Sequence, residues 1–341
     1  MIINNQKHLL LFKYWLITSI ILVFAMIVVG GLTRLTDSGL SITEWELLSG
    51  VLPPLNDNSW NHYFSLYKKI PQYELLNSNM SISEFKIIFL WEYFHRLLGR
   101  FIGLFYLIPL LYFSYKKVIN KKNSLIYYSI FFLILFQGFM GWYMVKSGLS
   151  NNISVSHYRL AAHLSIAFII IALLYWNLLN LNSGMNNSFS IMSFQNIKLK
   201  ILIPLILLQI IFGAFVSGLD AGKIYQTWPL MNSSYIPDDT QFNSLISVLD
   251  FNNKSLVQFI HRNLAYFIFF YILIISSVIF KDKNQKIKKT YLYVTFFLFL
   301  QIVLGIYTLL SGLNTLVALL HQITSVLLFL SIVRLNYVNL K

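Results

Sequence analysis

The stretch QGFMGWYMVKSGL at residues 137–149 and the stretch QIVLGIYTLLSGL at residues 301–313 share Gln, Gly, Tyr and Ser-Gly-Leu at identical spacing. Four such matches in the same chain order are not expected by chance. The chain is therefore predicted to be a duplicated four-helix unit, with halves at 1–185 and 186–341. Because four spans return the chain to its starting side, the halves would be parallel repeats about an axis along the membrane normal. The other matches are His95-Arg96 with His261-Arg262, His163 with His321, and Gly30-Gly31 with Gly213-Ala214.

The composition is that of an integral membrane protein. Of the 341 residues, 57% are hydrophobic and 11% are charged, whereas a soluble domain carries about 25% charged residues. Runs of about 20 apolar residues are long enough to cross a bilayer. The predicted fold is an all-α integral membrane protein with eight transmembrane helices in two pseudo-symmetric four-helix bundles. The expected spans are 10–33, 86–114, 124–146, 158–181, 198–218, 256–280, 290–311 and 315–336.

The net charge of +14 lies almost entirely on one side of these spans. Positively charged loops stay in the cytoplasm, so we expect both termini inside and the long loops 34–85 and 219–255 outside, in a bacterial inner membrane. This uneven distribution argues against nucleic acid as a partner. The long outer loops are candidate lids over the helix ends. The basic residues on the cytoplasmic side are Lys7, Lys13, Lys116, Lys117, Lys121, Lys122, Lys198, Lys200, Lys281, Lys283, Lys286, Lys288, Lys289, Arg334 and Lys341, beside the single acid Asp282.

Two further features limit the chemistry and the targeting of the chain. There is no cysteine, which excludes disulfides, thiolate ligands and thiol redox chemistry. The first apolar run, 9–32, is too long for the apolar core of a signal peptide and has no small-residue cleavage site after it.

Four histidines, His95, His163, His261 and His321, fall near the outer ends of the spans. Ser81-x-x-Glu84 has the pattern of a capping box that opens the second span, and His95 follows Lys86 by nine residues, about 13 Å along a helix. Histidine inside a membrane span is uncommon and is usually functional. Two pairs on a repeated scaffold predict two sites for a flat, metal-centred ligand, and neutral imidazole is a usual axial ligand of haem. The other histidines, His8, His62 and His157, have no counterparts in the repeat and are expected to be structural.

The two halves differ beside the first histidine of each pair. Glu92 lies three residues before His95, on the same helix face, whereas Gln258 takes that place before His261. A carboxylate inside a span is costly and usually functional, which predicts chemistry in the first half and a permanent cofactor in the second. An ion pair of Glu92 with the arginine at position 96 or 100 is the structural alternative.

Arginines near the outer ends are candidates for binding an anionic ligand. Arg96 and Arg262 are the strongest of these, because each directly follows a candidate iron ligand. A guanidinium group binds carboxylates such as haem propionates well. Pairing between helices and snorkelling to the surface are the competing interpretations.

Seven motifs are distributed over essentially the whole chain. They are GGLTRLTDSGLSI (30–42), WEYFHRLLGR (91–100), YRLAAHL (158–164), GLDAG (218–222), TWPLM (227–231), FIHR (259–262) and HQ (321–322). These motifs resemble those of the haem A synthase family, most closely its proteobacterial and mitochondrial branch. The resemblance implies oxidation of the C8 methyl group of haem O to a formyl group, giving haem A for terminal oxidases. Some members carry a cysteine pair in the first outer loop, which this chain lacks.

The resemblance also implies roles for individual residues. His95 and His163 would hold the substrate haem, and His261 and His321 would be the axial ligands of a haem b cofactor. Glu92 would be the catalytic group. The expected partners are the enzyme that makes haem O and assembly factors of cytochrome oxidase, and a homo-oligomer stays open.

Two other functions fit the same residues. A di-haem b-type electron carrier or quinol dehydrogenase also uses bis-histidine sites, although usually one near each membrane face. A haem chaperone or exporter would bind haem without changing it. The difference between Glu92 and Gln258 favours an enzyme over both.

Overall fold

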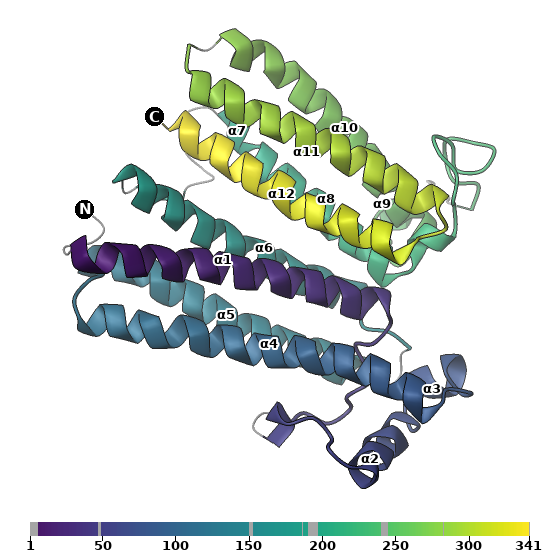
Figure 1. Cartoon of the computed structure of the whole chain (residues 1–341). Coiled ribbons are helices and arrows are strands. Elements are labelled where there is room, and N and C mark those ends of the chain that lie inside the picture. Colours follow the sequence, from purple (N-terminus) through teal and green to yellow (C-terminus); the bar gives the residue numbers. More distant parts are fainter. Residues whose placement is uncertain are drawn as a thin grey trace. The chain divides into compact units, whose positions relative to one another are not determined.

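The computed structural model describes residues 6–46, 49–149, 153–185, 187–189, 197–239, 245–281 and 283–340. Helices make up most of these residues, and no β-strand longer than an isolated bridge occurs among them (Figure 1). Eight helical segments are long and apolar enough to cross a membrane. The predicted all-α class with eight membrane-crossing helices is therefore confirmed, and each span agrees with its prediction to within about five residues. The pseudo-symmetry of two four-helix bundles stays a prediction. The eight segments are His8–Leu35, Ile82–Tyr115, Asn123–Gly148, His157–Ser183, Ile197–Gly218, Lys254–Lys281, Gln285–Leu310 and Thr315–Asn339.

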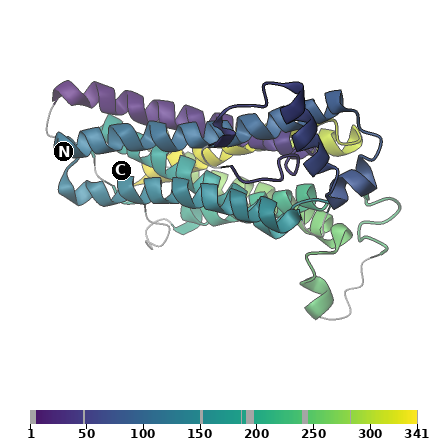
Figure 2. The same cartoon turned by 90° about the horizontal axis from the view of Figure 1, so that it is seen from below.

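Contacts between residues divide the chain into two compact units, residues 2–170 and residues 171–341. The first unit holds three whole spans and the first half of the span His157–Ser183, and the second holds the other half of that span and four whole spans. The predicted boundary between residues 185 and 186 stays a prediction. Within each unit the spans run side by side (Figures 1 and 2).

The first unit is built on α1 (Gln6–Leu35), α4 (Ile82–Tyr115), α5 (Lys121–Gly148) and the start of α6 (His157–Ser183). Helix α4 packs on α1 and on α5. At the end of the unit that holds the start of α1, aromatic rings fill the core. The ring of Phe12 lies 5.2 Å from Trp15 and 5.3 Å from Tyr127, between centroids. Their burial stabilises this end of the unit through the hydrophobic effect.

The second unit consists of α7 (Ile197–Lys200), α8 (Leu202–Gly218), α10 (Lys254–Lys281), α11 (Gln285–Leu310) and α12 (Thr315–Asn339). Helices α11 and α12 form one close pair, and α8 and α10 form another. Buried polar side chains link the pairs and their neighbours: the Asn336 side chain donates to the Leu199 carbonyl at 3.1 Å. A buried donor needs such a partner, because leaving it unpaired costs about 1–3 kcal/mol.

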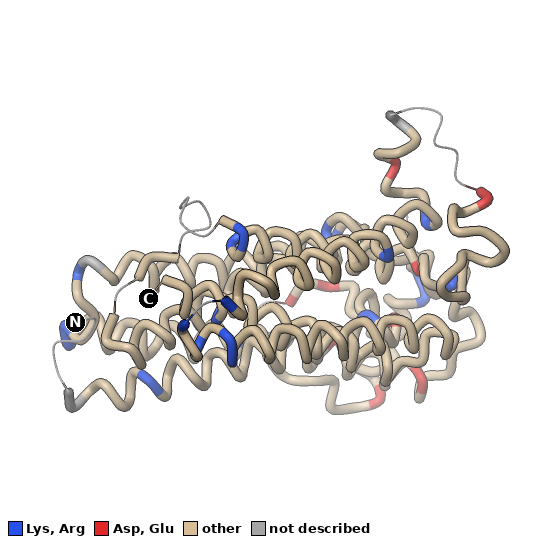
Figure 3. The backbone as a smooth tube through the Cα atoms, turned by 90° about the horizontal axis from the view of Figure 1, so that it is seen from above, with Lys and Arg blue, Asp and Glu red and all other residues tan. Residues whose placement is uncertain are grey.

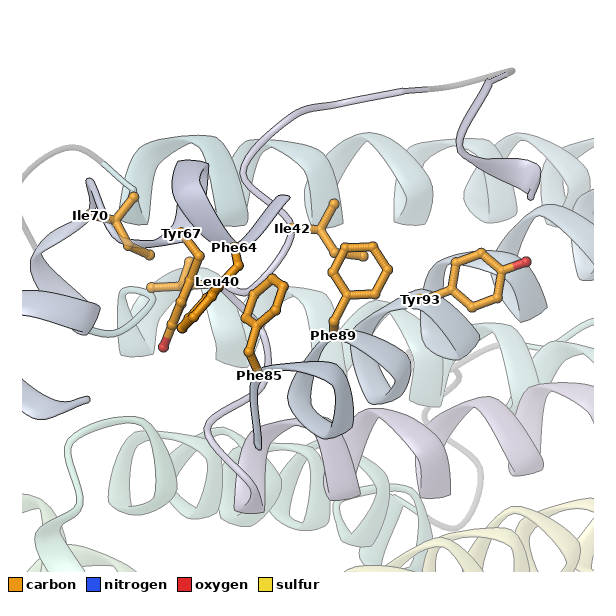
Figure 4. Packing of buried hydrophobic residues seen from close by; sticks show 8 residues of the cluster. All are labelled: Leu40, Ile42, Phe64, Tyr67, Ile70, Phe85, Phe89 and Tyr93. Carbon is orange, nitrogen blue, oxygen red and sulfur yellow. The ribbon is translucent and has the colours of Figure 1, made fainter. Parts of the chain in front are cut away.

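The first long loop packs on the first turns of α4 and forms a small, mainly aromatic cluster with them. It contains η1 (Ser49–Val51), α2 (Asp57–Tyr67) and α3 (Pro71–Leu76). Figure 4 shows the buried cluster formed by loop and helix. Its members are Leu40, Ile42, Phe64, Tyr67, Ile70, Phe85, Phe89 and Tyr93.

Helix α4 begins at Ile82, four residues before the predicted start, and the capping box of Ser81 and Glu84 is present as expected. Phe85 and Phe89 of these first turns are buried under the loop. The first turns of α4 are therefore apolar because they carry the loop, and the apolar pattern alone did not distinguish that surface from a lipid-facing one.

We expect a Phe85→Ala substitution to loosen the loop. Phe85 is fully buried, and its ring lies 4.9 Å from Phe64 and 5.3 Å from Tyr67, between centroids. Truncating such a residue costs about 3–5 kcal/mol. Limited proteolysis of the loop, followed by mass spectrometry, measures the effect. Leu75→Ala, at a residue that is 72% exposed, is the control, and equal cleavage rates in both variants would contradict the expectation.

The second long loop contains η2 (Ala221–Lys223) and α9 (Leu245–Val248). The Tyr225 hydroxyl donates to Asp239 at 2.8 Å, and Ser255 of α10 donates to the same carboxylate at 2.7 Å. Burial and this carboxylate raise the pKa of Tyr225, so the hydroxyl stays a donor. The loop is thereby tied to the first turn of α10.

The acidic residues that the structure describes lie at one end of each unit. All Asp and Glu side chains that the structure describes follow α1 or α8, or lie in the long loops and the first turns of α4 (Figure 3). The opposite end of each unit carries basic residues. This is the distribution from which the sequence predicted the orientation.

Candidate functional site

The four candidate histidines lie on four different spans. His95 is on α4 and His163 on α6, in the first unit, whereas His261 on α10 and His321 on α12 belong to the second. His95 and His163 are close enough to interact electrostatically, and so are His261 and His321. The structure therefore brings the histidines together in the two pairs that the sequence predicted.

Each histidine ring faces a glycine on a neighbouring helix. A Cβ placed on Gly30 would lie 3.0 Å from Cε1 of His95, and one on Gly141 would lie 3.2 Å from Cε1 of His163. These distances are shorter than those of ordinary carbon contacts, so a larger residue would push against the imidazole. The repeat noted in the sequence included these glycines, but nothing in it indicated that they touch histidines.

The second unit repeats this arrangement. The corresponding distances are 3.1 Å for Gly213 and His261 and 2.9 Å for Gly305 and His321. The same contact therefore occurs in four helix pairs. It indicates that each glycine, because it has no side chain, leaves the space into which the imidazole ring fits.

Glu92 is buried and fully engaged in polar contacts. One carboxylate oxygen accepts hydrogen bonds from the Ser41 hydroxyl at 2.7 Å and from the Ile42 N–H at 2.9 Å. The other accepts from Nε of Arg96 at 3.1 Å and from Nη2 at 2.6 Å. The alternative of an ion pair with Arg96 is thus realised, and it holds a negative charge in place.

The loop segment after α1 encloses this ion pair. Arg96 also donates to the carbonyls of Ile42 at 2.8 Å and of Glu44 at 3.2 Å, and its guanidinium lies 5.0 Å from the centre of the Trp45 ring. Arg100 donates to the carbonyl of Glu46. The sequence did not reveal that this short segment would supply both donors and acceptors to the buried pair.

The Glu46 side chain continues the network outward. Its carboxylate accepts a hydrogen bond from the Tyr63 hydroxyl at 3.0 Å. Burial, together with this carboxylate, raises the pKa of Tyr63 to about 12. Tyr63 therefore stays neutral near pH 7 and holds the loop against α2.

The equivalent place in the second unit has no carboxylate. Gln258 is buried and donates to the Tyr225 carbonyl at 2.9 Å. Arg262 donates to the same carbonyl at 2.9 Å and to the Leu230 carbonyl at 3.3 Å. Both units therefore use an arginine to hold the loop after the first span, but only the first unit pairs that arginine with a buried negative charge.

The remaining candidates lie outside these clusters. Arg159 donates to the Ser147 hydroxyl and stacks over the Tyr143 ring. His62 is exposed on α2, and His157 is buried against Tyr158, with ring centroids 4.0 Å apart. The expectation that His62 and His157 are structural stays a prediction.

We expect an Arg96→Leu substitution to destabilise the first unit strongly. Glu92 and Arg96 side chains are 3% and 10% exposed, and removal of one partner from a buried pair costs about 3–5 kcal/mol. The unfolding temperature of the purified protein measures the loss. In a Glu92→Gln background the same substitution should cost much less, because no charge is left behind. Equal losses in both backgrounds would contradict the ion-pair argument.

The matched control is the exposed pair Arg34–Asp37, in which Asp37 is 58% exposed. Such surface pairs contribute about 0–1 kcal/mol. Asp37→Asn should therefore leave the unfolding temperature nearly unchanged.

Comparisons with known proteins cover the whole chain. Residues 13–333 match the model of a family described as cytochrome oxidase assembly protein, COX15-CtaA. A curated protein of Pelagibacter ubique (strain HTCC1062), named heme A synthase, is 48% identical over 99% of this chain and 99% of its own length. A second of that name, from Rickettsia bellii (strain RML369-C), is 44% identical over 95% of this chain and 96% of its own.

Proposed function

This chain belongs to the COX15-CtaA family of cytochrome oxidase assembly proteins, and we propose that its two units divide haem A synthesis between a substrate site and a resident haem. The protein oxidises haem O to haem A in the bacterial inner membrane, which its eight apolar helices cross. The two sequence predictions of the family and of the activity are thereby confirmed. The assignment of residues to the two sites is our proposal.

The first unit is the substrate site, with His95 and His163 as the ligands of the haem O iron. The Nδ1 atoms of both rings are buried without a hydrogen-bond partner, although each residue keeps part of its surface accessible. Bis-histidine ligation by facing helices of a bundle is a familiar arrangement, and two imidazoles suffice because a porphyrin supplies the other four nitrogens.

The second unit holds haem b, with His261 and His321 as its axial ligands. The same features support this site: two imidazoles come from two helices of one unit, and Nδ1 of His321 is buried without a partner. When bound, this haem supplies electron transfer, which is the chemistry of its iron. No cluster of three or more His, Asp or Glu residues that could hold a bare metal ion occurs in the described part of the chain.

Glu92 is the catalytic residue in this proposal. The C8 methyl group of haem O is oxidised to an alcohol and then to a geminal diol, which loses water to leave the formyl group. A fixed carboxylate one helical turn from His95 stabilises positive charge that develops at the reacting carbon, or accepts a proton from it. Such effects are strong in a site that excludes water.

Arg262 and Arg96 remain our candidates for binding the haem propionates. Three of the five N–H groups of Arg262 lie outside the two hydrogen bonds described above. Arg96 uses four of its five, in the contacts with Glu92, Ile42 and Glu44. Arg262 is therefore the better placed of the two.

The single observation that carries this division of labour is the buried ion pair of Glu92, which the second unit replaces by Gln258. Extraction of the haems from purified protein, with identification by mass, tests it. Haem O, its hydroxylated form or haem A beside haem b is the expected result. Haem b alone would instead support the electron-carrier alternative.

We place both termini in the cytoplasm and the haem sites toward the periplasm, because the basic ends of the spans stay inside. The chain contains no cysteine, so a single cysteine introduced at Leu55, which is 79% exposed, reports on the orientation. A membrane-impermeant maleimide should label it from the periplasm of intact cells, and labelling only after lysis would contradict the placement. The enzyme that makes haem O is the proposed upstream partner.

A further inference from the structure

A glutamine lies one helical turn before three of the four glycines that face histidines. Gln209, before Gly213, places its amide nitrogen 3.2 Å from Nδ1 and 3.4 Å from Nε2 of His261, and donates to the His261 carbonyl at 3.1 Å. Gln137, before Gly141, donates to the His163 carbonyl at 2.9 Å. Each glutamine therefore contacts the histidine that its own glycine touches.

The third pair has the same arrangement. Gln301 places its amide nitrogen 3.2 Å from Nε2 of His321. The amide oxygens of Gln137, Gln209 and Gln301 are all buried without a hydrogen-bond partner. A buried acceptor without a donor is costly, so three repeated cases indicate a donor that comes into place when the site is filled.

Iron ligation creates such a donor. A neutral imidazole that binds iron through one nitrogen carries its proton on the other, and ligating histidines almost always give that proton to an acceptor. A half-turn of a glutamine amide exchanges its oxygen and nitrogen at nearly the same place, and the two are not distinguished by shape. At His261 and His321, whose ring nitrogens the amide already reaches, the glutamine oxygen then accepts the imidazole N–H, and the buried acceptor gains its missing donor. Gln137 contacts His163 through the backbone carbonyl, and it fixes the helix turn that carries this ligand.

The fourth histidine lacks this residue. Met26 occupies the place one turn before Gly30, and its terminal methyl packs toward α4, where a Cβ on Gly99 would lie 3.2 Å away. Nδ1 of His95 is buried without a partner. A thioether is only a weak acceptor. At the position that corresponds to the three glutamines, the first span therefore carries an apolar residue, which offers no amide to the histidine next to Glu92.

We propose that Gln209, Gln301 and Gln137 are positioning residues that fix three axial histidines, and that His95 is the ligand that releases and rebinds as substrate haem enters and product haem leaves. The assignment of the haems to the two sites rests on the proposed function above. Loss of the outer partner of a ligating histidine weakens metal binding by about 10–100-fold. The resident haem is thus fixed on both faces, and the haem that has to be exchanged is fixed on one.

The test uses the purified, haem-loaded protein and exchanges the two residue types. Excess apomyoglobin captures haem that dissociates, and mass identifies which haem is lost. In Met26→Gln, loss of the haem held by the first unit should slow about tenfold, whereas Met26→Leu should behave as the wild type. In Gln209→Met, loss of haem b should accelerate about tenfold, and Gln226→Met, at an exposed loop residue, is its control.

The reduction potential separates positioning from packing. An imidazole that no longer donates its N–H is a weaker donor to ferric iron, so the potential of haem b should become more positive in Gln209→Met and in Gln301→Met. A Met26→Gln variant that loses haem as fast as Met26→Leu would overturn the inference. So would an unchanged potential in both glutamine variants. Extraction of haem b alone from the wild type would refute the proposed function instead, while the two glutamine variants would still test their half of the inference.

Discussion

Replacing Glu92 with glutamine should lower haem A formation by about 100-fold or more, while the protein still binds haem O. Glutamine keeps the shape of the side chain and an oxygen that can accept from Ser41 and Ile42, but it removes the charge. Charge stabilisation or proton transfer by one group contributes about 10²–10⁴-fold to a rate. The ratio of haem O to haem A in membranes, measured by chromatography and mass, reports the effect.

Glu84→Gln is the matched control for this variant. Glu84 lies on the same helix, in the exposed capping box with Ser81, eight residues before Glu92. It should give wild-type amounts of haem A. Wild-type amounts in Glu92→Gln as well would refute the catalytic role. Because Arg96 loses its charged partner in that variant, its unfolding temperature has to be recorded alongside.

The second large effect concerns the resident haem. His261→Ala should remove haem b almost completely and stop haem A formation, because an axial ligand supplies a direct bond to iron. Haem O should remain bound by the first unit, whose histidines are untouched. The haem content of the purified variant, resolved by mass, measures both. Loss of haem O with retention of haem b would show that the two sites had been assigned the wrong way round.

His62→Ala serves as the histidine control. His62 is exposed on α2 and lies in neither pair. Both haems and the activity should be retained. A parallel loss in His62→Ala would mean that the histidine variants act through folding and not through ligation.

The spans and the histidine pairs were predictable because each depends on a simple periodic property. Twenty apolar residues with basic ends specify a span, and the repeat aligned His95 with His261 and His163 with His321. Each of these predictions concerns one helix, or two copies of the same helix in the repeat. The signal lies within the helix itself, so a single sequence is sufficient.

The partners of Glu92 could not be predicted in the same way. Ser41 and Ile42 lie some fifty residues before it, in a loop whose conformation depends on the burial of aromatic residues still further along the chain. From the sequence, Arg96 and Arg100 were equally possible partners for Glu92. The packing of the loop determines that Arg96 forms the ion pair and that Arg100 binds the Glu46 carbonyl. Contacts of this kind depend on tertiary structure, and no period or motif encodes them.

Gln209 is an intermediate case. It precedes Gly213 by four residues, as Gln137 precedes Gly141, so the repeat extends to a third helix pair. The spacing alone would have revealed this match. The contacts with histidine could not be predicted from it, because the glycine and the glutamine lie on one helix and the histidine on another.

The loop contacts of Glu92 have a consequence for biogenesis. The carboxylate receives two of its four hydrogen bonds from residues 41 and 42, and the loop that carries them packs on the first turns of α4. With the proposed orientation, that loop has to be exported before it can fold. Insertion of α1 and α4 therefore yields a helix pair with an incomplete site, and oxidising competence arises only on the far side of the membrane from the ribosome.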